Sequence, residues 1–206
     1  MSESQLCRQR FAIGIEYDGS AYNGWQVQPH APSIQQCINA ALSAVANTTT
    51  ACTGAGRTDT GVHASGQIAH FDTDAQRTLR SWLLGINSNL PDDISVLWVK
   101  PVPPDFHARF SAIARSYRYV ILNRPVRSAL ERLYAWWVYH PLDPDLMAAA
   151  AAALVGEHDF SAFRASSCQA HSAVRTLTEL KISHAGQHIY IECRANAFLH
   201  HMVRNI

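Results

Sequence analysis

The chain of 206 residues lacks any apolar run of about 18 residues, the least that a membrane-spanning helix needs. Its longest apolar segment, residues 146–155, is mostly alanine and about half as long as a membrane span requires. The charged first residues are not followed by an apolar stretch of the signal-peptide kind. We therefore expect a protein of the cytoplasm.

Cysteine is scarce, with five residues that are widely spaced and form no Cys-x-x-Cys pair. A zinc ribbon or a disulfide framework is therefore not expected, and buried apolar cysteines are favoured. A metal site assembled from more distant residues would have no diagnostic spacing. The residues available for such a site are Cys168, His171, Cys193, His200 and His201. We expect no metal.

Lysine is nearly absent, because only two of the 17 basic residues are lysine and the others are arginine. The net charge of +1 and the hydrophobic content of 48% exclude a mainly disordered chain. Residues 107–132 hold six arginines and one acid, interleaved with aromatic residues. Arginine suits phosphate contacts and stacking on bases, so this segment fits a nucleic-acid surface. A solvated strand edge protected by charge explains it equally well.

Apolar periodicity predicts helices and strands in both halves of the chain. The Pro-rich segment 101–106 predicts a linker, which would divide the chain into domains 1–105 and 106–206. Hairpin-type connections indicate an α+β fold with mainly antiparallel sheets. A Ser33–Gln36 pair predicts a capping box at the first helix. The predicted strands are 11–17, 51–55, 67–71, 94–100, 112–122, 134–139, 174–183 and 188–194, and the predicted helices are 34–46, 79–90, 144–156 and one that begins at Phe198.

A glycine-rich loop within residues 54–73 is the densest functional signal, because it holds Arg57, Asp59 and His63. Flexible backbone around a charged pair is typical of a site that a ligand approaches closely. A turn-rich strand connection with Asp59 as a cap is the structural alternative. A phosphate-binding loop would need lysine followed by serine or threonine after its last glycine, and a dinucleotide site would need three spaced glycines, so neither fits.

The sequence GRTDTGVHASGQIAHF in this loop resembles the active-site motif of the tRNA pseudouridine synthase A family. Four further stretches agree in the same order: EYDGSAYNGWQVQP with SIQQCINAAL, FHARFSAIARSYRYVI, GEHDFSAFRASSC and FLHHMVRNI. The resemblance implies two α/β subdomains joined into a central sheet, with the active-site cleft between them. It also implies an isomerase that converts uridine to pseudouridine at positions 38, 39 and 40 of the anticodon stem-loop. The expected partners are tRNA and a second copy of the chain, and no cofactor is expected.

The resemblance assigns roles to individual residues. Asp59 matches the catalytic aspartate, and Arg204 matches the basic residue that pairs with it. Tyr117 matches the tyrosine that packs on the target base and helps to remove its C5 proton, and Arg57 matches an arginine that helps to hold the flipped-out nucleotide. Where the family commonly has an arginine, this chain has His171, so one phosphate contact should be weaker. Two stretches match tRNA contacts: Phe106, His107, Ala108, Arg109 and Phe110, and Ser167, Cys168, Gln169, Ala170 and His171.

The family's catalytic domain continues beyond the motif that ends at Ile206, so we expect a shortened chain with weak or absent turnover. A tRNA-binding protein without turnover is therefore the second hypothesis. A small hydrolase built on Asp59 and His63 is the third.

Overall fold

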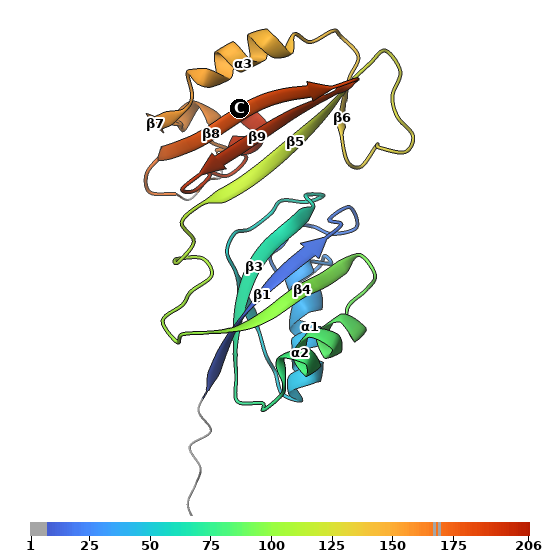
Figure 1. The fold of residues 1–206 in the computed structure, drawn as a ribbon, viewed down its shortest axis with the longest axis vertical. Helices are drawn as coiled ribbons and strands as arrows, with labels where there is room; N and C mark the ends of the chain where they lie inside the picture. Colours follow the sequence, from blue (N-terminus) through green and yellow to red (C-terminus); the bar gives the residue numbers. More distant parts are fainter. Residues whose placement is uncertain (1–7, 167, 169) are drawn as a thin grey trace, which may run out of the picture. The chain divides into compact units, whose positions relative to one another are not determined.

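The computed structural model describes residues 8–166, 168 and 170–206, which form two compact units (Figure 1). The first unit ends at Ala112 and the second begins at Ile113. The 106–110 segment therefore belongs to the first unit. The division into a catalytic domain 1–105 and a second domain 106–206 stays a prediction.

The first unit is a four-stranded sheet with two helices. All neighbouring strands are antiparallel, and their order is β2-β3-β1-β4. The elements are β1 (Gln9–Tyr17), α1 (Ile34–Ala46), β2 (Cys52–Gly54), β3 (Ala64–Thr73), α2 (Leu79–Ser88) and β4 (Ile94–Val102).

Both helices of this unit pack on one face of the sheet. Alternate residues of β1, such as Phe11 and Ile13, are buried there. The Trp82 ring of α2 lies 5.1 Å from the ring of Phe71 and 6.1 Å from that of Phe11. Alternation places Arg10 of β1 and His70 of β3 on the other face, which matters for the site.

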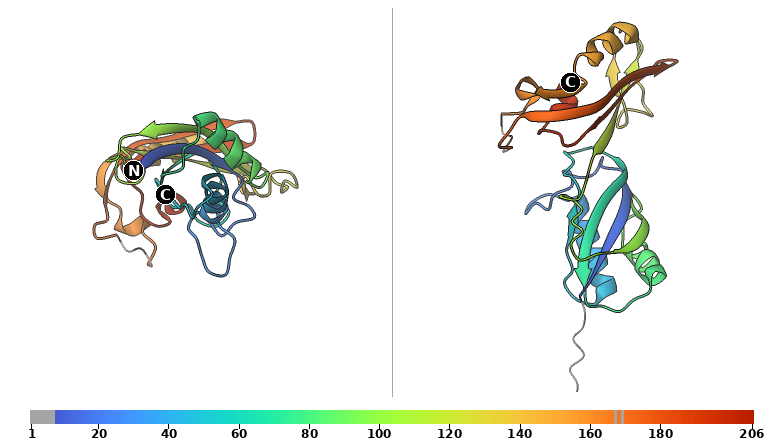
Figure 2. Two further views of the ribbon diagram at one scale, coloured as in Figure 1. Left: turned by 90° about the horizontal axis from the view of Figure 1, so that it is seen from below. Right: turned by 60° about the vertical axis from the view of Figure 1, so that its left-hand side comes forward.

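The second unit is a five-stranded sheet of order β6-β5-β9-β8-β7, in which only the β5–β6 pair is parallel. Helix α3 lies over this sheet rather than in its plane (Figure 2). The core gathers around Phe160, Leu177, Leu199 and Met202. The elements are β5 (Arg115–Asn123), β6 (Trp136–Val138), α3 (Pro144–Ala152), β7 (Gly156–Asp159), the 3-10 helix η1 (Ser161–Phe163), β8 (Val174–Ala185), β9 (His188–Ala195) and α4 (Met202–Asn205).

The predicted α+β class with mainly antiparallel sheets is confirmed. Three local predictions were wrong. Ser33 is the N-cap residue of α1, but its side chain makes no capping bond. The last helix begins at Met202 rather than Phe198, because His201 has a left-handed φ of 61°. Strand β4 extends into the predicted linker, and Pro101 is tolerated because β4 is an edge strand.

A search of the described part of the chain for a helix long and apolar enough to cross a membrane finds none.

Candidate active site

Asp59 lies in the loop of residues 55–63, which joins the antiparallel strands β2 and β3. The loop is held at its start by a bond from the Ala55 amide to the Ile68 carbonyl (2.7 Å). The Gln67 amide nitrogen donates to the Gly56 carbonyl at 2.8 Å. Asp59 is half-buried, whereas Arg57 is exposed.

A second loop, residues 18–25, holds the Asp59 loop from the side. The Trp25 amide donates to the Thr58 carbonyl at 3.0 Å, and the Gly61 amide donates to the Tyr22 carbonyl at 3.3 Å. The hydroxyl groups of Tyr17 and Thr58 share a hydrogen bond of 2.8 Å. The residues on both sides of Asp59 are thus tied to one neighbouring loop.

Gly24 permits this close approach. Its φ is +87°, and a Cβ atom at this position would overlap the carbonyl oxygen of Thr58 and lie 3.1 Å from the carbonyl carbon of Asp59. A side chain here would be strained in the backbone and would also push the Asp59 loop away.

The second loop is itself anchored to the start of β4. The Tyr22 hydroxyl donates to an Asp93 carboxylate oxygen at 2.6 Å, and the Asp18 amide donates to the Asp93 carbonyl at 2.9 Å. Burial, followed by this bond to Asp93, raises the pKa of Tyr22, so the hydroxyl stays protonated and keeps donating. Nδ1 of His63 lies 3.0 Å from Asp18 Oδ1 and 3.2 Å from the Gly19 amide nitrogen. His63 therefore connects the end of the Asp59 loop to the start of the second loop.

The 106–110 segment lies in the first unit, and its side chains range from buried to exposed. Ala108 is 2% exposed, Phe106 and His107 are half-buried, and Phe110 is 76% exposed. The His107 ring stacks on the Phe110 ring at 4.3 Å, and the Arg109 guanidinium lies 5.6 Å from the centre of that ring. The segment thus presents an exposed aromatic ring next to a cation.

Tyr117 and Arg204 lie in the second unit. Tyr117 is on β5, opposite Cys193 of β9, and its half-buried ring meets the edge of the Phe198 ring at 5.1 Å. Arg204 is exposed on α4, and its amide donates to the His201 carbonyl at 3.0 Å. Tyr117 therefore has a defined ring orientation set by the core of this unit.

The other predicted contact stretch is described only in part, because Ser167 and Gln169 lie outside the described residues. Cys168 and Ala170 pack against the core of the second unit, whereas His171 is exposed. Arg164 donates to the Cys168 carbonyl at 2.5 Å. Backbone hydrogen bonds, with Ala170 first and His200 next, lower the pKa of the Cys168 thiol.

Sequence reasoning singled out the Asp59 loop and the 106–110 segment but missed the residues that support them. Tyr17 and Gly24 lie in or next to a stretch that resembles the family, yet no spacing rule links them to Thr58. Arg10 and His70 support the 106–110 segment. His70 lies inside the stretch GRTDTGVHASGQIAHF, but no spacing rule links it to this segment. Arg10 lies outside the quoted stretches, and only its polar character on a sheet face was available as a signal.

Comparison with known proteins identifies the family. A family model described as tRNA pseudouridine synthase matches residues 13–111 and 150–206. A tRNA pseudouridine synthase A of Hydrogenovibrio crunogenus is 57% identical over 195 residues, which are 95% of this chain and 74% of that protein. Proteins of the same name from Pseudoalteromonas atlantica and Methylococcus capsulatus are 54% and 55% identical over 197 residues, 96% of this chain and 75% and 73% of theirs. The chain belongs to the tRNA pseudouridine synthase family, which confirms the resemblance found in the sequence.

Proposed function

We propose that this chain isomerises uridine to pseudouridine in tRNA, at positions 38, 39 and 40 of the anticodon stem-loop. The observation that carries the proposal is the Asp59 loop. Its Gly-Arg-Thr-Asp motif lies within the matched family region, and hydrogen bonds with Trp25 and Tyr17 hold Thr58, the residue before Asp59. A carboxylate on a fixed backbone is what this reaction requires.

The reaction is an internal rearrangement. The bond between N1 of uracil and C1′ of ribose breaks, the uracil turns, and a bond forms between C5 and C1′. N1 gains a proton and C5 loses one, so no electrons enter or leave. Asp59 is the catalytic residue at the ribose or the ring, Arg204 is its basic partner, and Tyr117 packs on the base.

The target nucleotide must leave the base stack, at a cost of a few kcal/mol that RNA contacts have to offset. We assign these contacts to Arg57, the 106–110 segment and the 167–171 stretch. The exposed Phe110 ring beside Arg109 supports this assignment, because a flat ring and a cation together suit a base and its phosphate.

We further propose that the protein is a cytoplasmic homodimer. The support is a segment of the second unit, residues 126–139, that is rich in exposed apolar side chains, among them Leu130 at 88%, Val126 at 70% and Trp136 at 59% exposure. Burial of these side chains against a second copy of the chain would remove their apolar surface from water.

Light scattering tests the dimer. Wild-type protein should have twice the mass of one chain, and the double change Leu130→Arg and Trp136→Arg should give monomers. Leu84→Arg, at an exposed apolar position on the first unit, is the matched control and should stay dimeric. A wild-type monomer, or a double variant that still dimerises, would contradict this interface.

The activity test uses tRNA that carries tritium at uridine C5. Wild-type protein should release tritium, and Asp59→Asn should retain tRNA binding but release none, because the amide keeps the size and removes the charge. Asp74→Asn, at an exposed acid outside the loop, is the matched control. Binding without release by the wild type would support the tRNA-binding alternative, and turnover by Asp59→Asn would refute the role of this residue.

A further inference from the structure

Two side chains attach the backbone of residues 104–108 to the first sheet, on the face opposite helices α1 and α2. Arg10 of β1 donates through Nη1 to the carbonyl oxygens of Pro104 (2.6 Å) and Phe106 (2.8 Å). Nδ1 of His70 on β3 accepts the amide of Ala108 at 3.1 Å in a buried position. Three backbone groups of residues 104–108 are thus hydrogen-bonded to the side chains of Arg10 and His70.

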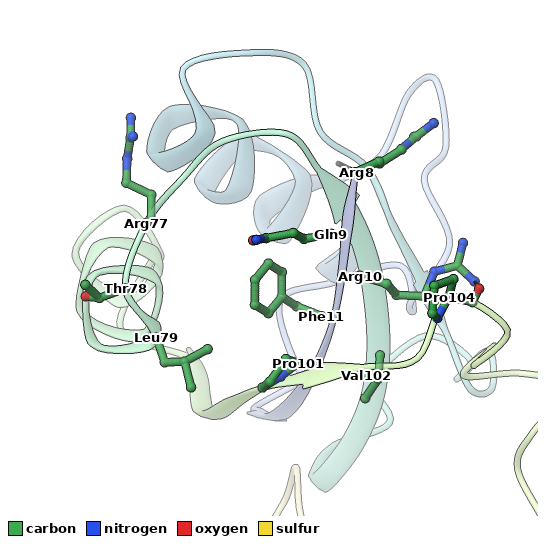
Figure 3. A pocket seen from close by; sticks show the side chains of 10 residues that line it. All are labelled: Arg8, Gln9, Arg10, Phe11, Arg77, Thr78, Leu79, Pro101, Val102 and Pro104. Atoms are coloured by element: carbon green, nitrogen blue, oxygen red, sulfur yellow. Dashed lines mark hydrogen bonds between the residues drawn. The ribbon is translucent and has the colours of Figure 1, made fainter. Parts of the chain in front are cut away.

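Arg10 is held in place for this task. Its Nε and Nη2 bind the two carboxylate oxygens of Asp72 at 2.6 and 2.7 Å. Arg10 and Asp72 are direct partners in the β1–β3 register, so the ion pair crosses neighbouring strands. In Figure 3 the guanidinium group of Arg10 lies beside Pro104, whereas the Arg8 side chain points away from it. The planar fork of arginine serves the carboxylate and the carbonyls together, which a lysine ammonium group cannot do.

Residues 107–111 are also held together by hydrogen bonds among themselves. Nδ1 of His107 lies within hydrogen-bonding distance of the amides of Arg109 (3.2 Å) and Phe110 (3.3 Å). The amide of His107 bonds to the Ser111 hydroxyl, and the Ser111 amide bonds to the His107 carbonyl at 2.7 Å. The attachments and these bonds use backbone groups, so the exposed side chains of Arg109 and Phe110 keep a defined position.

We propose that Arg10 and His70 are positioning residues for tRNA binding, which hold the 106–110 segment so that Arg109 and Phe110 are presented to the RNA. The inference rests on the proposed function, because it takes this segment as a tRNA contact. Neither residue touches the RNA in this scheme, and both act through the backbone of the segment.

The protonation state of His70 gives this role a distinctive readout. Burial, then the nearby Arg10 and His107, lowers the pKa of His70, against smaller opposing effects of Asp72 and a backbone hydrogen bond with Thr53. His70 is therefore neutral at pH 7, and its Nδ1 accepts the Ala108 amide. Protonation at acid pH turns Nδ1 into a donor that faces another donor, so the attachment is lost as the pH falls through the lowered pKa.

Two pairs of variants separate positioning from charge and from folding. Arg10→Lys keeps the charge but removes the fork. Arg8→Lys is its matched control, because Arg8 lies just before β1 and approaches the same Asp72 carboxylate at 3.9 Å. His70→Leu removes the acceptor and leaves a buried amide without a partner, whereas His70→Asn places an oxygen near the position of Nδ1 and cannot be protonated. Each variant is measured for tRNA affinity, for KM and kcat in tritium release, and for amide exchange of residues 104–112.

Arg10→Lys and His70→Leu should each weaken tRNA affinity and raise KM by about 10-fold, with kcat at saturating tRNA within about 2-fold. Amide exchange of residues 104–112 should become faster in both. Arg8→Lys should behave as the wild type. His70→Asn should recover most of the affinity and should lack the extra weakening of the wild type at acid pH.

Unchanged affinity in Arg10→Lys and His70→Leu would overturn the inference, whether or not exchange changes. A loss in kcat with unchanged KM, or a His70→Asn variant as weak as His70→Leu, would do the same. If wild-type protein neither binds tRNA nor releases tritium, the proposed function fails instead. If replacing Arg109 and Phe110 by alanine weakens binding while the Arg10 and His70 variants do not, only the positioning role fails.

Discussion

Gly24 offers a quantitative test of how the Asp59 loop is held. The cost of its replacement by alanine has a backbone part and a contact part, and Gly61 in the same region isolates the first. Gly61 has a similar positive φ of +75°, but no atom lies within 4 Å of the position that its Cβ would take. A left-handed conformation costs an L-residue about 1–2 kcal/mol, partly offset by about 0.4–1 kcal/mol because alanine makes the unfolded chain less flexible. Gly61→Ala should therefore lower the free energy of unfolding by about 1 kcal/mol.

Gly24→Ala adds the contact part. The new methyl group overlaps the Thr58 carbonyl oxygen, which also accepts the Trp25 amide. Overpacking of this kind costs about 1–3 kcal/mol, and loss of the hydrogen bond adds about 0.5–1.5 kcal/mol. We expect a total loss of about 3–5 kcal/mol. Because Asp59 follows Thr58 directly, a shift of about 1 Å in the loop should also lower kcat by about 100-fold.

Urea unfolding followed by tryptophan fluorescence measures the stability part, and tritium release below the melting temperature measures the activity part. Gly66→Ala is a second control, because Gly66 is exposed on β3, has no positive φ and has no atom within 4 Å of its would-be Cβ. Its unfolding free energy should be unchanged or slightly raised. Equal losses in Gly24→Ala and Gly61→Ala would show that the close approach of Gly24 to Thr58 does not stabilise the Asp59 loop, and this would refute the reasoning.

Two further outcomes are expected. Binding of tRNA should weaken as the salt concentration rises. Arg109→Gln should reduce the slope of log affinity against log salt concentration by about 0.7–0.9, which is the effect of one lost phosphate contact. A slope equal to that of the wild type would contradict a phosphate contact by Arg109. Timed alkylation at pH 8, followed by mass spectrometry, should modify Cys168 before Cys193 and Cys52. Burial raises the pKa of Cys193 to about 11 and that of Cys52 to about 12, whereas backbone hydrogen bonds lower the pKa of Cys168. Equal rates at Cys52 and Cys168 would show that burial does not protect the thiol.

Elements with a strong local pattern could be predicted from the sequence. Helix α1 has the predicted bounds 34–46, because its apolar residues recur at helical spacing and all face one core. The β8–β9 hairpin was predicted from Ala185-Gly186, and Gly186 has the positive φ that such a turn uses. In both cases the residues of one short segment are enough to determine its backbone conformation, so the sequence could predict it.

The end of the chain shows what periodicity cannot specify. The apolar spacing of Phe198, Leu199, Met202 and Val203 predicted one helix from Phe198. Leu199 and Met202 are indeed buried, and the other two pack against the same core. The backbone nevertheless becomes helical only at Met202, after the left-handed His201. Burial follows from the pattern, but several backbone paths can bury the same residues.

The Asp59 loop and the 106–110 segment share one structural principle that no local pattern reveals. The Asp59 loop is held through the backbone groups of Gly56, Thr58 and Gly61, and the 106–110 segment is held through those of Phe106 and Ala108. Most of the partners lie far away in the sequence, so only the folded unit brings them together. Backbone attachment fixes where a loop lies without using the side chains that are proposed to meet the RNA. The position of each loop therefore depends on residues elsewhere in the fold, such as Trp25 for the Asp59 loop and Arg10 for the 106–110 segment.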